Sequence, residues 1–350
     1  MKIIIFIFYF LLSFHIQSQN TRPIRDDIGY CWKPDQFNYL INFLESKTND
    51  LPNVQKMVAG ISPHDDYLYA ARAYYSLFKN IRVKEVVIFG VTHSTVRKKI
   101  GDPQNKLIFD DFLFWSGPTK KIPVSALREF LKKNMPGEYI MTSNLAHKLE
   151  HSIEATLPFL QYFNPEIKIT PIMVTGMPFA QMERISDEIS KFITAYIRQN
   201  RLQLGRDIFF LISSDANHYG QDFKNTRFGQ DARAHELATN QDKKIAQAYL
   251  SGNISRLIIK DLAQTLWGKT YRGFNSTLWC GKYSIPFGML TVLKILEKIK
   301  EENTLRGRIL YHSDTYSDGV LPIKNTGLGI TAPFSLKHWV GFFSAGFFIN

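Results

Sequence analysis

Runs of consecutive apolar residues alternate along the chain with segments whose apolar residues recur every three or four positions. Continuous apolar runs are typical of strands buried on both faces of a parallel sheet, and the wider spacing is typical of amphipathic helices. The pattern predicts strands over residues 56–62, 85–90, 167–174, 208–212, 308–312 and 340–348. It predicts helices over residues 34–46, 69–80, 125–133, 178–199, 231–250, 254–267 and 284–301. This alternation predicts an α/β fold with a central, mainly parallel mixed sheet flanked by helices.

Some stretches interrupt the alternation. Residues 100–123 are irregular, and we expect a loop or short antiparallel strands over the edge of the sheet. Ser152 is expected to cap a helical segment that Pro158 bends or restarts. Residues 319–338 contain turn-forming prolines and glycines, which predicts a long loop before the last strand. Because no linker or repeat divides the chain, we expect one domain over residues 22–349.

The chain is basic and rich in apolar residues. Its formal net charge is +12 and 45% of its residues are hydrophobic, which is ample for a packed core. The basic residues occur in scattered pairs and no nucleic-acid-binding motif is present, so we interpret them as solvated faces and expect no nucleic-acid partner.

Residues 1–18 have the form of a secretory signal peptide. Lys2 precedes an apolar run from Ile3 to Phe14, and a polar exit follows around Ser18. An uncleaved anchor is the alternative, but the run is short compared with a membrane span of about 20 residues. We therefore expect export, cleavage near Gln19 and no stable membrane insertion afterwards.

Three predicted strands are followed by residues that can bind a metal or transfer a proton. His64 and His93 each follow a strand, and Asp215 and His218 follow the run at 208–212. A strand, helix and strand joined by a right-handed crossover are parallel, which brings His64 and His93 to one edge of the sheet. Ligands of open α/β sheets bind beyond this edge. The alternative for each histidine is a satisfied polar residue, and for Asp215 it is a cap of the next segment.

His64, His93 and Cys280 form a possible metal site. Two imidazoles and a thiolate suit iron, copper or zinc, whereas Mg²⁺ and Ca²⁺ require oxygen ligands. Cys280 precedes a predicted helix, whose dipole is expected to favour the thiolate. Three protein ligands leave positions open for water, dioxygen or substrate, and Asp215 and His218 are then candidate catalytic residues beside the metal. Cys31 offers a competing disulfide with Cys280 in an oxidising compartment.

Five ordered motifs resemble the Memo family, which includes the AmmeMemoRadiSam system protein B. They span nearly the whole chain from Arg22 and are Pro63-His64-x-x-Tyr67, Gly90-x-x-His93, Glu150-His151-Ser152-Ile153-Glu154-x-x-Leu157-Pro158-Phe159, Ser213-Ser214-Asp215-x-x-His218-x-Gly220 and Cys280-Gly281. The resemblance implies a single domain similar to class III extradiol dioxygenases, with metal held by His64, His93 and Cys280. It also implies that His151 and Glu154 serve the cofactor site.

The chain departs from related patterns at several points. Those dioxygenases use a carboxylate where this chain has Cys280, and the softer thiolate favours copper or a redox role over ring cleavage. Asp65 and Asp66 replace a small pair that is common in the family, and Asp65 is expected to accept an imidazole N–H. Residues 319–338 resemble an insertion. The signal peptide also differs from the cytosolic family members.

Two classes of function follow. The first is a metal-dependent redox enzyme or oxygenase that acts on a small molecule, with His218 as general acid or base and Asp215 orienting it or a water. The second is a non-catalytic protein that binds a peptide or another ligand in the same crevice. Metal content and dioxygen consumption distinguish the two.

Overall fold

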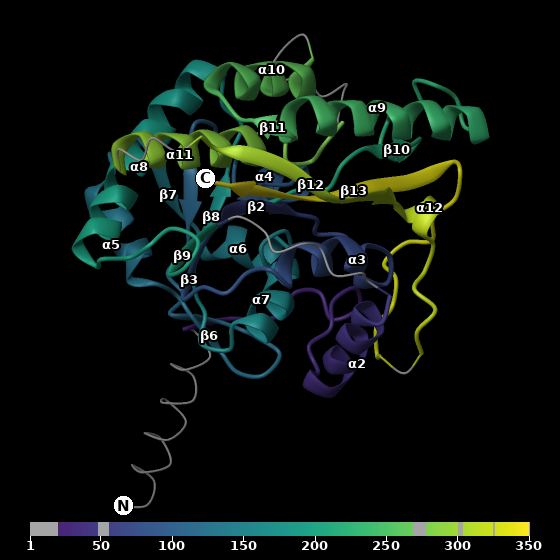
Figure 1. Ribbon diagram of the computed structural model, residues 1–350, viewed down its shortest axis with the longest axis horizontal. Helices are drawn as coiled ribbons and strands as arrows, with labels where there is room; N and C mark the ends of the chain where they lie inside the picture. The colour runs from purple at the N-terminus through teal and green to yellow at the C-terminus, as the bar shows by residue number, and fades with distance from the viewer. Residues whose placement is uncertain (1–19, 48–55, 269–277, 300–303, 325, 350) are drawn as a thin grey trace, which may run out of the picture.

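A large mixed sheet forms the centre of the protein (Figure 1). The computed structural model describes residues 20–47, 56–268, 278–299, 304–324 and 326–349. Within these residues the strand order is β11-β12-β13-β2-β9-β3-β8-β4-β7, and β10 pairs with β13 beside this path. The predicted α/β fold with a mixed sheet is therefore confirmed. Residues 1–18, the predicted signal peptide, lie outside the described residues.

The strands of this sheet follow the apolar runs closely. Their bounds are β2 Met57–Ser62, β3 Glu85–Val91, β4 Leu107–Phe109, β7 Ile140–Thr142, β8 Lys168–Val174, β9 Ile208–Ser213, β10 His218–Gly220, β11 Gly252–Asn253, β12 Arg306–Asp314 and β13 His338–Phe348. Every residue of β2 and β9 is buried, as expected for strands covered on both faces.

The four central strands are parallel. β2 pairs with β9, β9 with β3 and β3 with β8, whereas β13 is antiparallel to β2 and β4 is antiparallel to β8. The parallel course of β2 and β3 was predicted, but β9 lies between them. His64, His93 and Asp215 thus follow three adjacent strands at their carboxyl ends.

Helices cover both faces of the sheet (Figure 1). Helices α8 Phe179–Gln199, α9 Ala232–Leu250, α10 Arg256–Trp267 and α11 Ser284–Ile299 lie on one side. Helices α2 Pro34–Glu45, α3 Tyr67–Phe78 and α7 Leu157–Phe163 lie on the other. Each group packs its apolar side chains into a separate core cluster against the sheet. The remaining helices are α4 Ser94–Lys99, α5 Ala126–Asn134, α6 Asn144–Leu149 and α12 Thr315–Asp318.

The predicted irregular segments have mixed outcomes. Within residues 100–123, β4 joins the main sheet, whereas β5 Phe114–Trp115 and β6 Ile122–Pro123 form an antiparallel pair that β1 Thr21–Arg22 extends. The segment between α12 and β13 contains no helix or strand among its described residues, as expected for a loop.

The segment around Ser152 differs from the prediction. Ser152 does not cap a helix, because its Oγ accepts the backbone N–H of Val91 at 3.0 Å. A 3₁₀ turn over Glu154–Thr156 leads into α7, where Pro158 stands in the first turn. Pro158 therefore starts the helix, a position at which its missing N–H costs nothing. Among the described residues, no helix combines the length and apolarity that a membrane span requires.

Candidate metal centre

His64 is oriented by a hydroxyl at the end of the neighbouring strand. Its Nδ1 lies 2.9 Å from Ser213 Oγ, which donates its own hydrogen to the Ser152 carbonyl at 2.6 Å. Ser213 can therefore only accept from His64, so Nδ1 carries the proton. The unprotonated Nε2 lies 3.4 Å from Cys280 Sγ. This tautomer is the one in which Nε2 can bind a metal.

His93 is oriented by a buried carboxylate. Glu150 Oε1 accepts from His93 Nδ1 at 2.8 Å, and Oε2 accepts from the His93 backbone N–H at 3.0 Å. Burial lowers the pKa of His93, but the Glu150 carboxylate outweighs burial and the net pKa is raised. A carboxylate on Nδ1 leaves Nε2 available, the arrangement that orients many metal-binding histidines.

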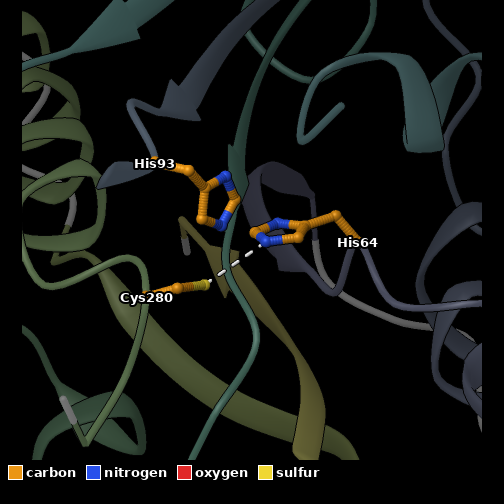
Figure 2. A group of neighbouring side chains, drawn as sticks. All are labelled: His64, His93 and Cys280. Atoms are coloured by element: carbon orange, nitrogen blue, oxygen red, sulfur yellow. Dashed lines mark hydrogen bonds between the residues drawn. The ribbon is translucent and has the colours of Figure 1, made fainter. Parts of the chain in front are cut away.

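Cys280 completes a group of three donor atoms. His64, His93 and Cys280 each offer one ligand atom, and these atoms lie within 4.8 Å of one another (Figure 2). A nitrogen and a sulfur bound to one tetrahedral ion at about 2.0 and 2.3 Å would be about 3.5 Å apart. The observed 3.4 Å between His64 Nε2 and Cys280 Sγ fits this separation. The donor set therefore fits a borderline or soft transition metal.

The surroundings of Cys280 do not favour the thiolate, although a helix dipole was expected to do so. Burial raises the pKa of the thiol well above its usual value, and the Asp215 carboxylate raises it further. Helix α11 begins only at Ser284, and the Asp215 backbone N–H, which donates to Sγ at 3.1 Å, does not offset burial. The thiolate therefore depends on a nearby positive charge, such as a bound cation.

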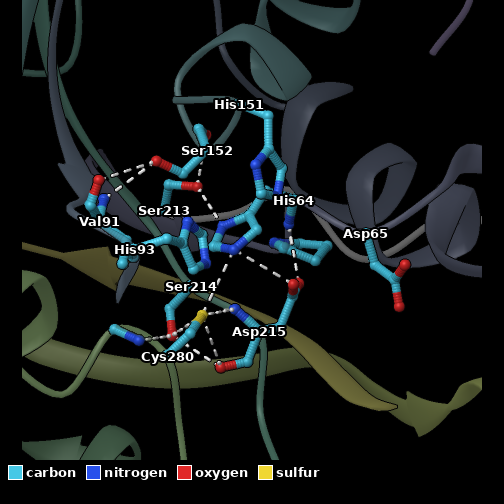
Figure 3. Close-up of polar contacts among 12 residues, drawn as sticks. His64, Asp65, Val91, His93, His151, Ser152, Ser213, Ser214, Asp215 and Cys280 are labelled. Atoms are coloured by element: carbon cyan, nitrogen blue, oxygen red, sulfur yellow. Dashed lines mark hydrogen bonds and ion pairs between the residues drawn. The ribbon is translucent and has the colours of Figure 1, made fainter. Parts of the chain in front are cut away.

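Asp215 lies beside His64. Its Oδ1 accepts the His64 backbone N–H at 2.8 Å, and its Oδ2 lies 3.3 Å from His64 Nε2 (Figure 3). Burial raises the pKa of Asp215 to about 7. The side chain is thus placed next to the donor atoms and is able to exchange a proton near neutral pH.

His218 lies at the start of β10. Its Nδ1 donates to the Ala216 carbonyl at 3.0 Å, which leaves Nε2 as an acceptor. The ring packs edge-on against Phe223 with centroids 5.0 Å apart. Burial lowers the pKa of His218 to about 4, so the imidazole is neutral at pH 7.

His151 stacks on His93, with ring centroids 4.7 Å apart and planes inclined by 10°. It forms a second group of possible ligands with His93 and Glu150. Burial lowers the pKa of His151 to about 3, and the neighbouring His93 lowers it further. The structure therefore places His151 as a neutral ring against His93 and against His64, whose ring centroid is 5.2 Å away.

Two residues assigned to the cofactor site make no contact with the metal-binding imidazoles, although Asp65 lines the cavity. Glu154 forms a buried ion pair with Arg22 and accepts the Asp26 backbone N–H at 2.8 Å, so it ties down the N-terminal segment. Asp65 Oδ1 accepts the Asp66 backbone N–H at 2.7 Å, and Figure 3 shows its carboxylate pointing away from the imidazoles. The expected acceptor role of Asp65 is wrong, since Ser213 and Glu150 hold the two Nδ1 atoms.

A cavity of about 640 Å³ opens above the donor atoms. His64, His93, His151, Asp215, His218 and Cys280 all line it. Phe223, Phe334 and His338 line it as well, as do Arg25, Arg97 and Lys282. Volumes of this size are typical of small-molecule sites.

The two cysteines lie in different surroundings. Cys31 Sγ is 3.7 Å from the Lys33 carbonyl and 4.0 Å from the Thr326 carbonyl, whereas Cys280 Sγ contacts His64 and Asp215. Both thiols are free. The neighbouring Tyr30, not Cys31, reaches the site, because its hydroxyl donates to the His64 carbonyl at 2.5 Å.

The sequence prediction missed the roles of Glu150 and Ser213. Both residues stand inside motifs that carry histidines, and that proximity is the only available signal. Glu150 accepts backbone N–H groups from His93, His151 and Ser152, so burial of its charge is offset by several donors. Burial alone would raise the pKa of Glu150, but the charge and the side-chain hydrogen bond of His93 outweigh burial and hold this pKa well below its usual range.

The fold and the site together define an α/β protein with a candidate metal centre at the carboxyl ends of parallel strands. The family model described as Memo-like protein matches residues 29–318. The chain belongs to the Memo family.

Curated relatives agree with this assignment. A MEMO1 family protein of Saccharolobus solfataricus is 32% identical over 244 residues, which cover 68% of this chain and 72% of that protein. A MEMO1 family protein of Pyrococcus horikoshii is 27% identical over 246 residues, which cover 65% and 78% of the two chains. A third, from Thermococcus kodakarensis, is 31% identical over 212 residues, which cover 57% and 66%.

Proposed function

We propose that the protein is a metal-dependent redox enzyme that acts on a small molecule. The observation that carries the proposal is the convergence of His64, His93 and Cys280 beneath a cavity of about 640 Å³. Three protein ligands leave further positions facing the cavity. Iron or copper is the proposed metal, with zinc as the redox-silent alternative. When bound, iron or copper would supply one-electron chemistry and polarise a substrate oxygen.

The residues around the donors have distinct proposed roles. His218 is neutral at pH 7 and its Nε2 is an acceptor, so it can take a proton from a bound substrate. Asp215 is close enough to hold a water or a substrate hydroxyl next to His64. His151 covers one face of His93 and restricts access of water from that side.

Replacing His218 with Gln is expected to slow turnover by about a hundredfold while metal content is unchanged, because a general base commonly contributes this much. The measurement is dioxygen consumption by the iron- or copper-loaded protein with ascorbate, which must lose a proton when it gives up electrons. His235→Gln is the control, since His235 pairs with Asp314 outside the cavity. Equal rates in the two variants would remove the role of His218, and no consumption above the metal-free protein would contradict the redox proposal.

We also propose that the protein is exported. Residues 1–18 supply the apolar signal sequence, and the mature chain is expected to begin close to Gln19. Mass spectrometry of the protein recovered from the producing cells measures this directly. An intact Met1 on protein retained in the cytoplasm would refute the proposal.

A further inference from the structure

A buried carboxylate on α9 contacts both of the segments that carry Cys280 and His218. Asp242 is 1% exposed and lies outside the cavity lining. Its Oδ1 accepts the indole N–H of Trp279 at 3.0 Å, and its Oδ2 accepts the backbone N–H of Asn217 at 3.0 Å. Trp279 directly precedes Cys280, and Asn217 directly precedes His218. The carboxylate therefore joins the neighbour of a metal donor to the neighbour of the proposed general base.

The two segments also contact each other directly. The backbones of Asn217 and Trp279 form an antiparallel bridge. The backbone N–H of Asp215 donates to Cys280 Sγ at 3.1 Å (Figure 3). Asp242 comes from a third element, 25 and 37 positions away from its two partners in the sequence. The position of the sulfur relative to Asp215 thus depends on this carboxylate as well as on the backbone.

The surroundings of Asp242 suit a carboxylate and no other side chain equally well. An indole N–H and a backbone N–H can only donate, so both side-chain oxygens must accept. Asparagine has one acceptor oxygen, and its amide nitrogen would face the second donor. Trp279 is 0% exposed, so no solvent is available to replace the lost acceptor. Gly341 leaves the space for this group, because a Cβ there would lie 2.9 Å from Asp242 Oδ2.

Stability alone does not account for a carboxylate at this position. Both of the donors to Asp242 are neutral, and a charge buried among neutral groups is costly. Burial raises the pKa of Asp242 to about 7, although both hydrogen bonds lower it. What the carboxylate provides in return is a fixed position for two segments of the site.

We propose that Asp242 is a positioning residue that fixes Cys280 relative to Asp215. The inference rests on the proposed metal centre and deepens it by naming what holds the sulfur in place. The two imidazoles are held by hydrogen bonds to their Nδ1 atoms. Asp242 gives the sulfur a comparable support, which acts through Trp279. Loss of such support typically lowers metal affinity by about 10- to 100-fold.

Cobalt binding to Asp242→Asn tests the proposal in the metal-loaded protein. Cobalt(II) accepts imidazole and thiolate ligands, and a bound thiolate gives a charge-transfer absorption band. At about pH 8, above the pKa of Asp242, we expect cobalt affinity to fall by about tenfold and the band per bound cobalt to be weaker at saturation. Asp110→Asn is the matched control, because Asp110 is a buried carboxylate that accepts the indole N–H of Trp115 at 2.7 Å. The control should keep the wild-type band.

Alkylation of Cys280 tests the same claim without a metal. The chain has two cysteines, so Cys280 is the single thiol in a Cys31→Ser background. In the metal-free protein we expect Asp242→Asn to raise the alkylation rate several-fold, because a less firmly held segment exposes its sulfur more often. Asp110→Asn in the same background should react at the rate of the background protein.

A second variant separates positioning from folding. Trp279→Phe removes the indole N–H but keeps an aromatic ring against Phe343, whose centroid is 4.7 Å from that of Trp279. Chemical denaturation shows whether each variant is folded, and if Asp242→Asn is not, Trp279→Phe alone must reproduce both effects. Because Asp242 is proposed to act through Trp279, the double variant should lose no more cobalt affinity than Asp242→Asn.

The outcomes distinguish this inference from the proposed function. Equal effects of Asp242→Asn and Asp110→Asn on either measurement would overturn the inference, and so would additive losses in the double variant. Absence of cobalt binding to the wild-type protein would instead contradict the proposed metal centre. The alkylation rates would then decide whether Asp242 positions Cys280.

Discussion

Replacing Cys280 with Ser is expected to weaken transition-metal binding by at least about tenfold. The variant loses the sulfur that lies 3.4 Å from His64 Nε2, and the two remaining imidazoles provide an incomplete set of protein ligands. Metal affinity is measured by competition against a chromophoric chelator with metal-free protein. Loss of sulfur should reduce affinity for copper and zinc, because both bind thiolate strongly.

Cys31→Ser is the matched control for this experiment. Cys31 is the other cysteine of the chain, and it contacts the carbonyls of Lys33 and Thr326 rather than a histidine. Its replacement should leave metal affinity unchanged. Equal affinities in Cys280→Ser and wild-type protein, or equal losses in the two variants, would contradict the ligand assignment.

Glu150→Gln should lower metal affinity by less than Cys280→Ser does. Glutamine keeps the shape of the glutamate side chain, but it accepts a weaker hydrogen bond from His93 Nδ1 and so orients this imidazole less firmly.

The second large effect concerns folding stability. Glu154→Ala is expected to lower the free energy of unfolding by about 3 to 5 kcal/mol, because it leaves the buried Arg22 guanidinium without its carboxylate. The side chains of Arg22 and Glu154 are 1% and 0% exposed. Arg22 also donates to the carbonyls of His147 at 3.0 Å and Glu150 at 2.7 Å, so the ion pair links the N-terminal segment to the metal centre.

Chemical denaturation of the purified variants measures this effect. Glu166→Ala is the control, because Glu166 pairs with Lys120 at the surface and its side chain is 88% exposed. Such exposed pairs contribute at most about 1 kcal/mol. A loss in Glu154→Ala no larger than in the control would show that the buried ion pair does not stabilise the fold.

Much of the fold was predictable because its central strands are continuous apolar runs. The strands at 85–90 and 208–212 and the helix at 178–199 agree with β3, β9 and α8 to within one residue at each end. Local pattern could not reveal that β9 enters the sheet between β2 and β3, since that order depends on contacts between distant segments. β4, with three residues in the sheet, is too short to give a periodic signal.

Part of the candidate site was predictable because its position also follows from the pattern of strands. His64 and His93 follow parallel strands, so the rule for carboxyl ends brought them together without knowledge of side-chain direction. The roles of Asp65 and Glu154 depend on the direction of their side chains, which the sequence pattern does not give. Adjacent side chains in extended backbone point to opposite sides, which turns Asp65 away from the imidazole of its neighbour. Glu154 faces Arg22, a partner that is 132 positions earlier in the chain and that sequence spacing alone does not identify.

X-ray absorption spectroscopy of the zinc-loaded protein tests the central claim most directly. The account predicts about one zinc per chain, with one sulfur at about 2.3 Å and two imidazole nitrogens at about 2.0 Å in its first shell. The sulfur contribution should be absent from residual metal in Cys280→Ser and present in Cys31→Ser. A wild-type spectrum that contains no sulfur neighbour, or a protein that retains no zinc, would contradict the claim that His64, His93 and Cys280 form a metal centre.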